Sequence, residues 1–184
     1  FERVLDEAGR EVLLDRASRS WAVSPPQLYI AKGRSAKVGL RWLGAVPADA
    51  TRSFIVVVEE LAVAGAGPRT SAEISVLTRY LLPLHVGARA APNVDAQILA
   101  RAGTTVLRLS NRGRTYVRLS ELTLAWSAPG AVGRGQVAGA TLAERARTDA
   151  LLPGGVLEYD AAAIGLPSLH HSLVVSTSFH ESPP

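Results

Sequence analysis

The sequence contains no cysteine and no methionine. Without cysteine, the chain has no disulfide framework, no thiol nucleophile and no cysteine-based zinc site. Because position 1 is a phenylalanine, we expect the chain to begin after processing or to be a fragment of a longer protein. Aromatic residues are also scarce, at 5%, whereas hydrophobic residues make up 47% of the 184 positions. The core should therefore consist mainly of valine, leucine and alanine side chains.

Long runs of basic or apolar residues are absent as well. The net charge is +4 and the pI is about 10.0, but the arginines stand singly, unlike the concentrated basic stripe of a nucleic-acid-binding protein. No apolar run reaches the roughly 18 residues of a membrane span. The opening segment, FERVLDEAGR, does not have the pattern of a signal peptide. The sequence thus predicts no nucleic-acid binding and no membrane insertion.

Motifs for catalysis and for metal binding are lacking. There is no G-x-S-x-G motif, and the glycine-rich segment 130–140 lacks the Lys-Ser/Thr of a phosphate-binding loop, so we predict a surface loop there. His170 and His171 are adjacent, and in a strand they would point to opposite faces, which is poor geometry for a shared metal ion. Glu59 and Glu60 would likewise diverge. We predict no enzyme, no catalytic or metal site and no cofactor.

Short apolar segments that alternate or cluster, bounded by Gly, Pro, Ser and Asn, are the dominant pattern, and they indicate β-strands. The predicted strands are 35–42, 52–63, 74–86, 104–111, 114–126 and 172–179. Between two of them, SNRG is predicted to form a hairpin turn in which Asn111 and Gly113 adopt positive φ. The segment 141–152 is predicted to be a loop or a short surface helix.

Strands at this spacing, without crossover helices, predict antiparallel sandwiches. The segment 86–96 has small residues, a proline and no alternation, which is typical of a domain boundary. We therefore predict an all-β protein of two immunoglobulin-like antiparallel β-sandwich domains, comprising residues 1–87 and 88–184.

Four segments, in this order and spacing, resemble the PapD-like periplasmic chaperones of the chaperone–usher pilus pathway. They are SPPQLYIAKGRSAKVGLRW (24–42), PADATRSFIVVVEELAV (47–63), ISVLTRYLLPLHV (74–86) and TTVLRLSNRGRTYVRLSELTLAW (104–126). The RYxLP element and the L-x-L-S-N-x-G pattern resemble most the archaic branch of that family. The resemblance covers roughly residues 20–126, and it implies that the first domain is incomplete at its N-terminus, because family members begin with further strands.

The resemblance implies a function for the long segment 74–86. In this family an edge strand is lent to a pilus subunit that lacks one strand of its own, and alternate side chains fill the subunit's groove. On this chain Ala72, Ile74 and Val76 would be the groove fillers, and Arg79 would hold the subunit's terminal carboxylate. Leu81 stands where better-studied members have lysine. The residues alone leave open that this is the core face of an ordinary strand and that Arg79 is merely solvated.

By family position, the resemblance also implies that Glu60 and His85 contact each other at the cleft between the domains, with His85 protonated. The residues alone leave open that they are two unrelated polar residues at strand ends. The implied function is that of a periplasmic chaperone that binds and stabilises a pilus or surface-coat subunit by donor-strand complementation and delivers it to an outer-membrane usher. Two alternatives remain open at this point. One is a two-domain immunoglobulin-like adhesion or structural module that donates no strand, and the other is an enzyme with a site built from scattered residues.

Overall fold

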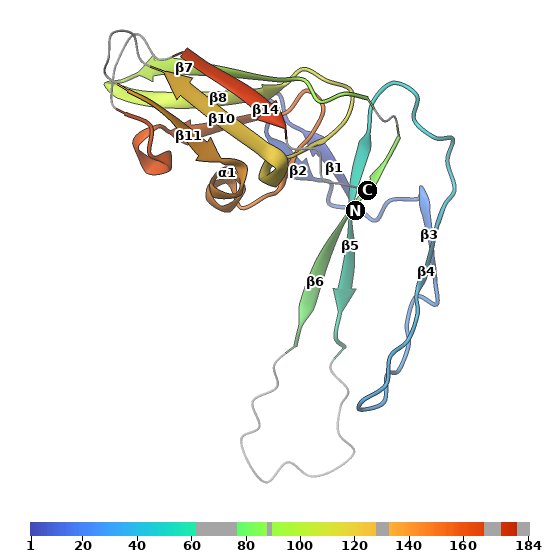
Figure 1. The fold of residues 1–184 in the computed structure, drawn as a ribbon. Helices are drawn as coiled ribbons and strands as arrows, with labels where there is room; N and C mark the ends of the chain where they lie inside the picture. The colour runs from blue at the N-terminus through green and yellow to red at the C-terminus, as the bar shows by residue number, and fades with distance from the viewer. Residues whose placement is uncertain (62–76, 88–89, 128–132, 168–173, 180–184) are drawn as a thin grey trace.

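A computed structural model describes residues 1–61, 77–87, 90–127, 133–167 and 174–179 (Figure 1). This part of the chain contains fourteen β-strands, one α-helix and two short 3₁₀ helices. All strand pairs are antiparallel. The all-β fold class predicted from the sequence is therefore confirmed.

We use the name first unit for the described residues before Ala88, which form six strands. Four of them form one sheet in the order β2-β1-β5-β6, and β3 and β4 form a separate two-stranded ribbon. Their bounds are Glu2–Leu5 (β1), Glu11–Leu13 (β2), Trp21–Ser24 (β3), Gly39–Trp42 (β4), Arg52–Glu59 (β5) and Arg79–Val86 (β6). In Figure 1 the β5–β6 pair and the β3–β4 ribbon extend from the body of the molecule as two arms.

The second unit, residues 90–179, is an immunoglobulin-like sandwich. One sheet has the order β13-β8-β7, the other has the order β11-β10-β14, and β9 and β12 form a short pair. The strands are Val94–Arg101 (β7), Thr104–Asn111 (β8), Val117–Arg118 (β9), Leu122–Ser127 (β10), Arg134–Ala138 (β11), Ala150–Leu151 (β12), Val156–Asp160 (β13) and Val174–Phe179 (β14). The helix α1 spans Gly139–Ala146, and the 3₁₀ helices span Leu119–Glu121 and Ala162–Ile164.

The hydrophobic core of the described residues lies almost entirely in the second unit. Leu107 and Leu109 of one sheet face Leu124 of the other, and all three are fully buried. Among the described residues of the first unit, Phe54 is the only buried large apolar residue. The alternation read from 104–111 accounts for this core, because every second side chain of β8 points into the sandwich.

Several sequence-based predictions of local structure are corrected. The segment 114–126 is not one strand, because a 3₁₀ turn separates β9 from β10. SNRG does not join a hairpin: β8 pairs with β7 and β13, and neither Asn111 nor Gly113 has positive φ. Instead the buried Asn111 side chain accepts a hydrogen bond from Gly113 N and donates to the carbonyl groups of Thr115 and Leu151.

The segment 130–140 also differs from the predicted loop, because its described part contains β11 and the start of α1. Glycine is required there by close packing. A Cβ on Gly139 would lie 1.8 Å from the Leu119 carbonyl oxygen, so the chain can turn into the helix only with glycine at this position. The helix α1 places Leu142 in the core, and it is thus more than a surface helix.

Candidate functional site

The β5–β6 arm is the most unusual feature of the first unit. The two strands pair along all eight residues, but β1 pairs with β5 only at Phe54 and Ser53. Beyond these residues the arm has no other strand beside it in the described structure. Its outer half is therefore a two-stranded ribbon, which is marginal by itself in water.

Among the described residues, no strand pairs with the outward edge of β6. Ile55 N donates to Phe1 O on the β1 side, so the odd-numbered residues of β5 face β1 and the even-numbered residues bond to β6. The register then directs the backbone groups of Arg79, Leu81, Pro83 and His85 away from β5. Pro83 has no N–H to donate, and it occupies a position whose N–H would have faced outward. The edge position that proline indicated in the sequence is confirmed by the strand order.

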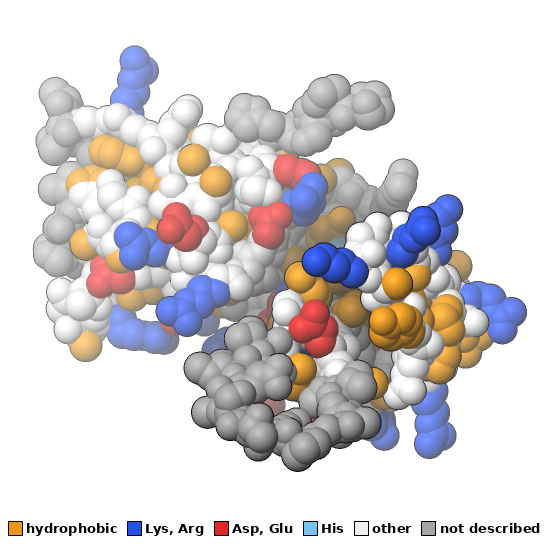
Figure 2. Space-filling view, turned by 90° about the horizontal axis from the view of Figure 1, so that it is seen from below, with side chains coloured by type: hydrophobic (Ala, Val, Ile, Leu, Met, Phe, Trp, Pro, Cys, Tyr) orange, Lys and Arg blue, Asp and Glu red, His pale blue; other side chains and the backbone are white. Residues whose placement is uncertain are grey.

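Both faces of the arm carry exposed apolar side chains. Val58, Tyr80 and Leu82 lie on one face and Leu81 lies on the other, because side chains alternate along each strand. Tyr80 and Leu81 are each 57% exposed. All the exposed large hydrophobic side chains of the described residues fall between Val12 and Leu82, and Figure 2 shows apolar side chains gathered on the arms. Exposed apolar surface of this kind marks an interaction site.

The residues predicted to fill a subunit groove, Ala72, Ile74 and Val76, lie outside the described residues. The predicted anchor, Arg79, is the first residue of β6. Its Nε lies 2.8 Å from Glu59 Oε1, and both side chains are at least half exposed. An exposed pair of this kind contributes about 0–1 kcal/mol. Because this ion pair is weak, the Arg79 guanidinium can release Glu59 and bind another carboxylate instead.

Glu60 and His85 are not brought together. Glu60 lies at the outer end of the arm, where its carboxylate accepts a hydrogen bond of 2.8 Å from Thr78 N. His85 lies at the base of the arm and pairs with Ser53. Glu60 is seven residue steps along the chain from Ser53, the partner of His85, which is roughly 23 Å at the rise of a strand. Antiparallel pairing sets this separation, because the end of one strand meets the start of the next.

His85 does lie where the two units meet. Its Nδ1 is 2.8 Å from Ser53 Oγ, and its ring stacks on Tyr116 of the second unit at 3.6 Å between centroids. Burial, together with the positive charges of Arg3 and Arg118, lowers the pKa of His85 to about 4. The predicted protonation is thereby corrected: His85 is neutral at pH 7. Tyr116 is 31 positions away, and no sequence signal links the two rings.

An aromatic cluster fixes the base of both arms. Trp21 of β3, Trp42 of β4 and Phe54 of β5 meet edge to face, with centroids 5.2–5.9 Å apart. The Arg52 guanidinium lies over Trp42 and Phe54, where a cation–π contact is worth about 0.5–1 kcal/mol. Sequence analysis missed this cluster, although two of the three tryptophans in the chain belong to it.

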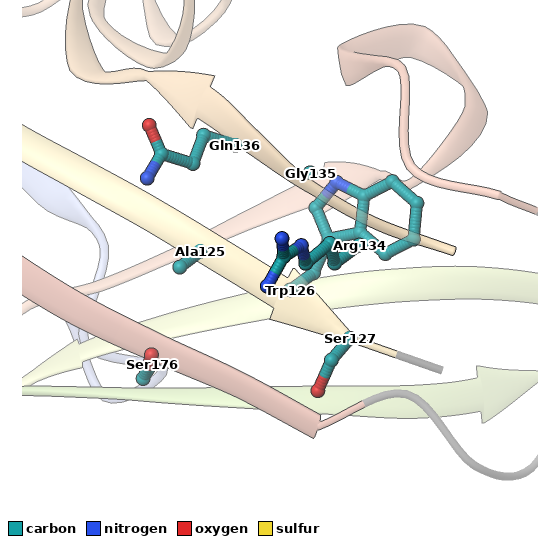
Figure 3. A pocket seen from close by; sticks show the side chains of 7 residues that line it. All are labelled: Ala125, Trp126, Ser127, Arg134, Gly135, Gln136 and Ser176. Atoms are coloured by element: carbon teal, nitrogen blue, oxygen red, sulfur yellow. The ribbon is translucent and has the colours of Figure 1, made fainter. Parts of the chain in front are cut away.

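The β11–β10–β14 sheet carries a pocket that is separate from the arm (Figure 3). It is lined by Ala125, Trp126, Ser127, Arg134, Gly135, Gln136 and Ser176. Gly135 leaves room for the Trp126 ring, which would lie 2.7 Å from an added Cβ. None of these side chains is a buried polar group without a partner, so the pocket is a weaker candidate than the arm.

Metal-binding clusters and membrane-spanning helices are both lacking among the described residues. These residues contain no group of three or more His, Cys, Asp or Glu side chains arranged to hold a metal ion. No helix in the same residues is long and apolar enough to cross a bilayer.

Comparison with known proteins relates the fold to one solved assembly. No family model and no curated protein matches the sequence. The fold is similar to a chain of a structure described as a chaperone–tip adhesin complex vital for synergistic activation of CFA/I fimbriae biogenesis. The TM-score is 0.52 at 13% identity, over 99% of this chain and 77% of that one. At this identity the likeness shows the fold alone, which is an all-β, immunoglobulin-like, chaperone-type fold.

Proposed function

We propose that this protein is a chaperone that binds a pilus or surface-coat subunit by lending it an edge strand. The observation that carries this proposal is the open edge of β6, whose outer half is apolar and exposed on both faces. The fold likeness to a chain of a chaperone–adhesin complex supports the same class of partner. An immunoglobulin-like subunit that lacks one strand offers the complementary surface, which is an apolar groove bordered by unpaired backbone.

In this mechanism the subunit adds a strand beside β6. The backbone groups of Arg79 and Leu81 would pair with it, while Pro83 supplies only a carbonyl and limits pairing toward the base of the arm. Tyr80 and Leu82 share the face that Ala72, Ile74 and Val76 would occupy in a continuous strand, since all five positions are even. These side chains would enter the groove, and the free energy of binding would come from apolar burial.

Arg79 is the proposed anchor for the subunit's terminal carboxylate. Its guanidinium can bind a carboxylate through two parallel hydrogen bonds. On binding the subunit, Arg79 would release the exposed carboxylate of Glu59.

The remaining parts of the proposal follow from the resemblance of the sequence to the family. These parts are membership of the archaic branch, a location in the periplasm, and domains at 1–87 and 88–184. The last part is delivery of the subunit to an outer-membrane usher. The protein would be no enzyme and would use no cofactor, because strand exchange involves no bond-breaking chemistry. The contacts that carry it are backbone hydrogen bonds and apolar packing.

Co-expression with a pilus subunit whose immunoglobulin-like fold lacks one strand tests the proposal. Size-exclusion chromatography should recover a one-to-one complex. Leu82→Asp should abolish it, because the carboxylate would enter an apolar groove unpaired. Ser178→Asp is the matched control, since it adds the same charge to an exposed strand position of the second unit. If Leu82→Asp retains the complex, or if no complex forms, the chain is instead an adhesion or structural module without strand donation.

A further inference from the structure

A cleft of about 730 Å³ separates the first unit from one edge of the sandwich. One wall is the β1–β2 turn, another is the C-terminal end of α1, and the floor is formed by β13 with its neighbour β8. The β1–β2 hairpin lies beside the sandwich in Figure 1, and Gly9 O accepts a hydrogen bond of 2.8 Å from Val156 N. The cleft is separate from the β5–β6 arm, with which it shares no lining residue.

Arginine dominates the lining. Five arginines face two glutamates there, namely Arg10, Arg101, Arg108, Arg145 and Arg147 against Glu11 and Glu158. Arg3 holds Glu11 by two hydrogen bonds, Arg101 and Arg108 lie within 3.2 Å of Glu158, and Arg10 pairs with Asp6. Both glutamates are therefore neutralised, and the cleft keeps a positive surplus.

Arg145 and Arg147 make up this surplus. Each is exposed, and neither side chain has a hydrogen bond or an ion pair within the described part of the chain. Arg147 ends α1 with φ +55°, one of two non-glycine residues with positive φ among those described. An L-residue is sterically disfavoured there, and glycine is the usual choice at this helix position. Two guanidinium groups are thus placed at one wall of the cleft without a counterion.

A buried hydroxyl provides an independent observation. Tyr159 lines the cleft, is only 5% exposed, and its hydroxyl has no hydrogen-bond partner in the described structure. The Nε of Arg108 is also buried and makes no hydrogen bond, although it lies 3.2 Å from a Glu158 oxygen. Buried polar groups in native proteins are nearly always satisfied. Both groups are donors, so the missing partner is an acceptor, and an oxyanion fits the surrounding charge.

The floor of the cleft favours a peptide over a small anion. β13 is the outer strand of its sheet, and Asn111 N donates to Gly155 O, so the odd-numbered residues bond to β8. The backbone of Glu158 therefore points into the open edge, next to the Val156 group that Gly9 already occupies. An open edge pairs with extended polypeptide, which a free phosphate cannot imitate.

We propose that this cleft binds an extended acidic segment of a partner protein, with carboxylates on Arg145 and Arg147 and backbone pairing along β13. The inference goes beyond strand donation by β6 and does not depend on it. A guanidinium binds a carboxylate through two parallel bonds, which suits a row of glutamates or aspartates. A volume of 730 Å³ is sufficient for several residues.

Fluorescence anisotropy on the whole chain tests the inference, with a dye-labelled peptide of alternating glutamate and valine as the probe at about 0.15 M salt. We expect saturable binding, and at least ten-fold weaker binding of the same peptide with glutamine in place of glutamate. Arg145→Gln/Arg147→Gln should weaken the acidic peptide about ten-fold or more, the usual effect of losing a charge-assisted hydrogen bond. Arg16→Gln/Arg19→Gln, which removes equal charge outside the cleft, should leave affinity unchanged.

The Tyr159→Phe variant tests whether the Tyr159 hydroxyl contacts the peptide or is only buried beside it. It removes one donor and leaves the charge intact, so affinity should fall several-fold if the hydroxyl contacts the peptide. The proposal is overturned by equal binding of the glutamine peptide, by equal losses in the two arginine pairs, or by complete displacement by inorganic phosphate at the same concentration. Leu82→Asp should keep peptide affinity unchanged, so failure of the β6 site and failure of this cleft are distinguishable.

Discussion

Among single residues, His85 shows that a residue's place in the sequence does not fix which side chains it contacts in the folded protein. It was expected to pair with Glu60, and it instead stacks on Tyr116 and bonds to Ser53. Burial disfavours the charged imidazolium, and the positive charges of Arg3 and Arg118 near the ring add to this effect, so the neutral form is favoured. The junction between the units is therefore sensitive to acid through this one ring.

The pH dependence of stability follows with a definite sign. The unfolded chain binds a proton at His85 near pH 6.5, whereas the folded chain does so only near pH 4. Protons therefore favour the unfolded state, and the free energy of unfolding should fall as pH drops from 6.5 to 4. His85→Phe keeps a stacked ring and removes the titration. Thermal melts at pH 7 and pH 5 should show a smaller loss of Tm for this variant than for the native chain, and equal losses would contradict the assignment.

At the level of elements, β6 combines an open edge with a proline. Pro83 sits where no ladder bond to β5 is lost, and it removes one donor from the exposed edge. Such a device limits pairing between copies of the same arm. If β6 receives a subunit's strand, as proposed above, its edge must not pair with a second copy of the same arm.

Replacing Pro83 tests this role of the edge. Pro83→Val restores the outward N–H, and it should increase self-association of the chain, visible as dimers or larger species in light scattering after size-exclusion chromatography. Leu84→Val is the control, because its backbone already bonds to β5. A strictly monomeric Pro83→Val protein would show that proline has no protective role at this edge.

Considered as a whole, the described residues have a packed hydrophobic core in the second unit and exposed large apolar side chains in the first. The core lies between the two sheets of the second unit, whereas the arms of the first unit expose their large apolar side chains. The first unit is tied to the second by several contacts. Thr51 N donates to Arg114 O, the Arg114 side chain donates to the Ala48 and Asp49 carbonyl groups, and Arg3 bonds to Thr148. Among the described residues, the packed core and the exposed large apolar side chains thereby lie in different halves of the chain.

This division predicts two different responses to leucine truncation. Leu124→Ala removes a fully buried side chain, and it should lower the free energy of unfolding by about 2–5 kcal/mol. Leu82→Ala removes a side chain that is 49% exposed, and the change should stay within about 0.5 kcal/mol. Urea denaturation of both variants measures the difference. Similar losses would mean that the arm contributes to the core of the free protein.

The sequence by itself determined the all-β class, the alternating strand at 104–111 and the edge position of Pro83. These features depend on the residue and its near neighbours: alternate burial along 104–111 has period two, and proline lacks a donor in any fold. Only the tertiary structure decided which strands pair, that α1 buries Leu142, and that His85 meets Tyr116. It also assembled the cleft, because Arg10, Arg101 and Arg147 come from three distant elements. Such contacts are set by chain topology and packing between segments far apart in sequence, and no local pattern of residues encodes them.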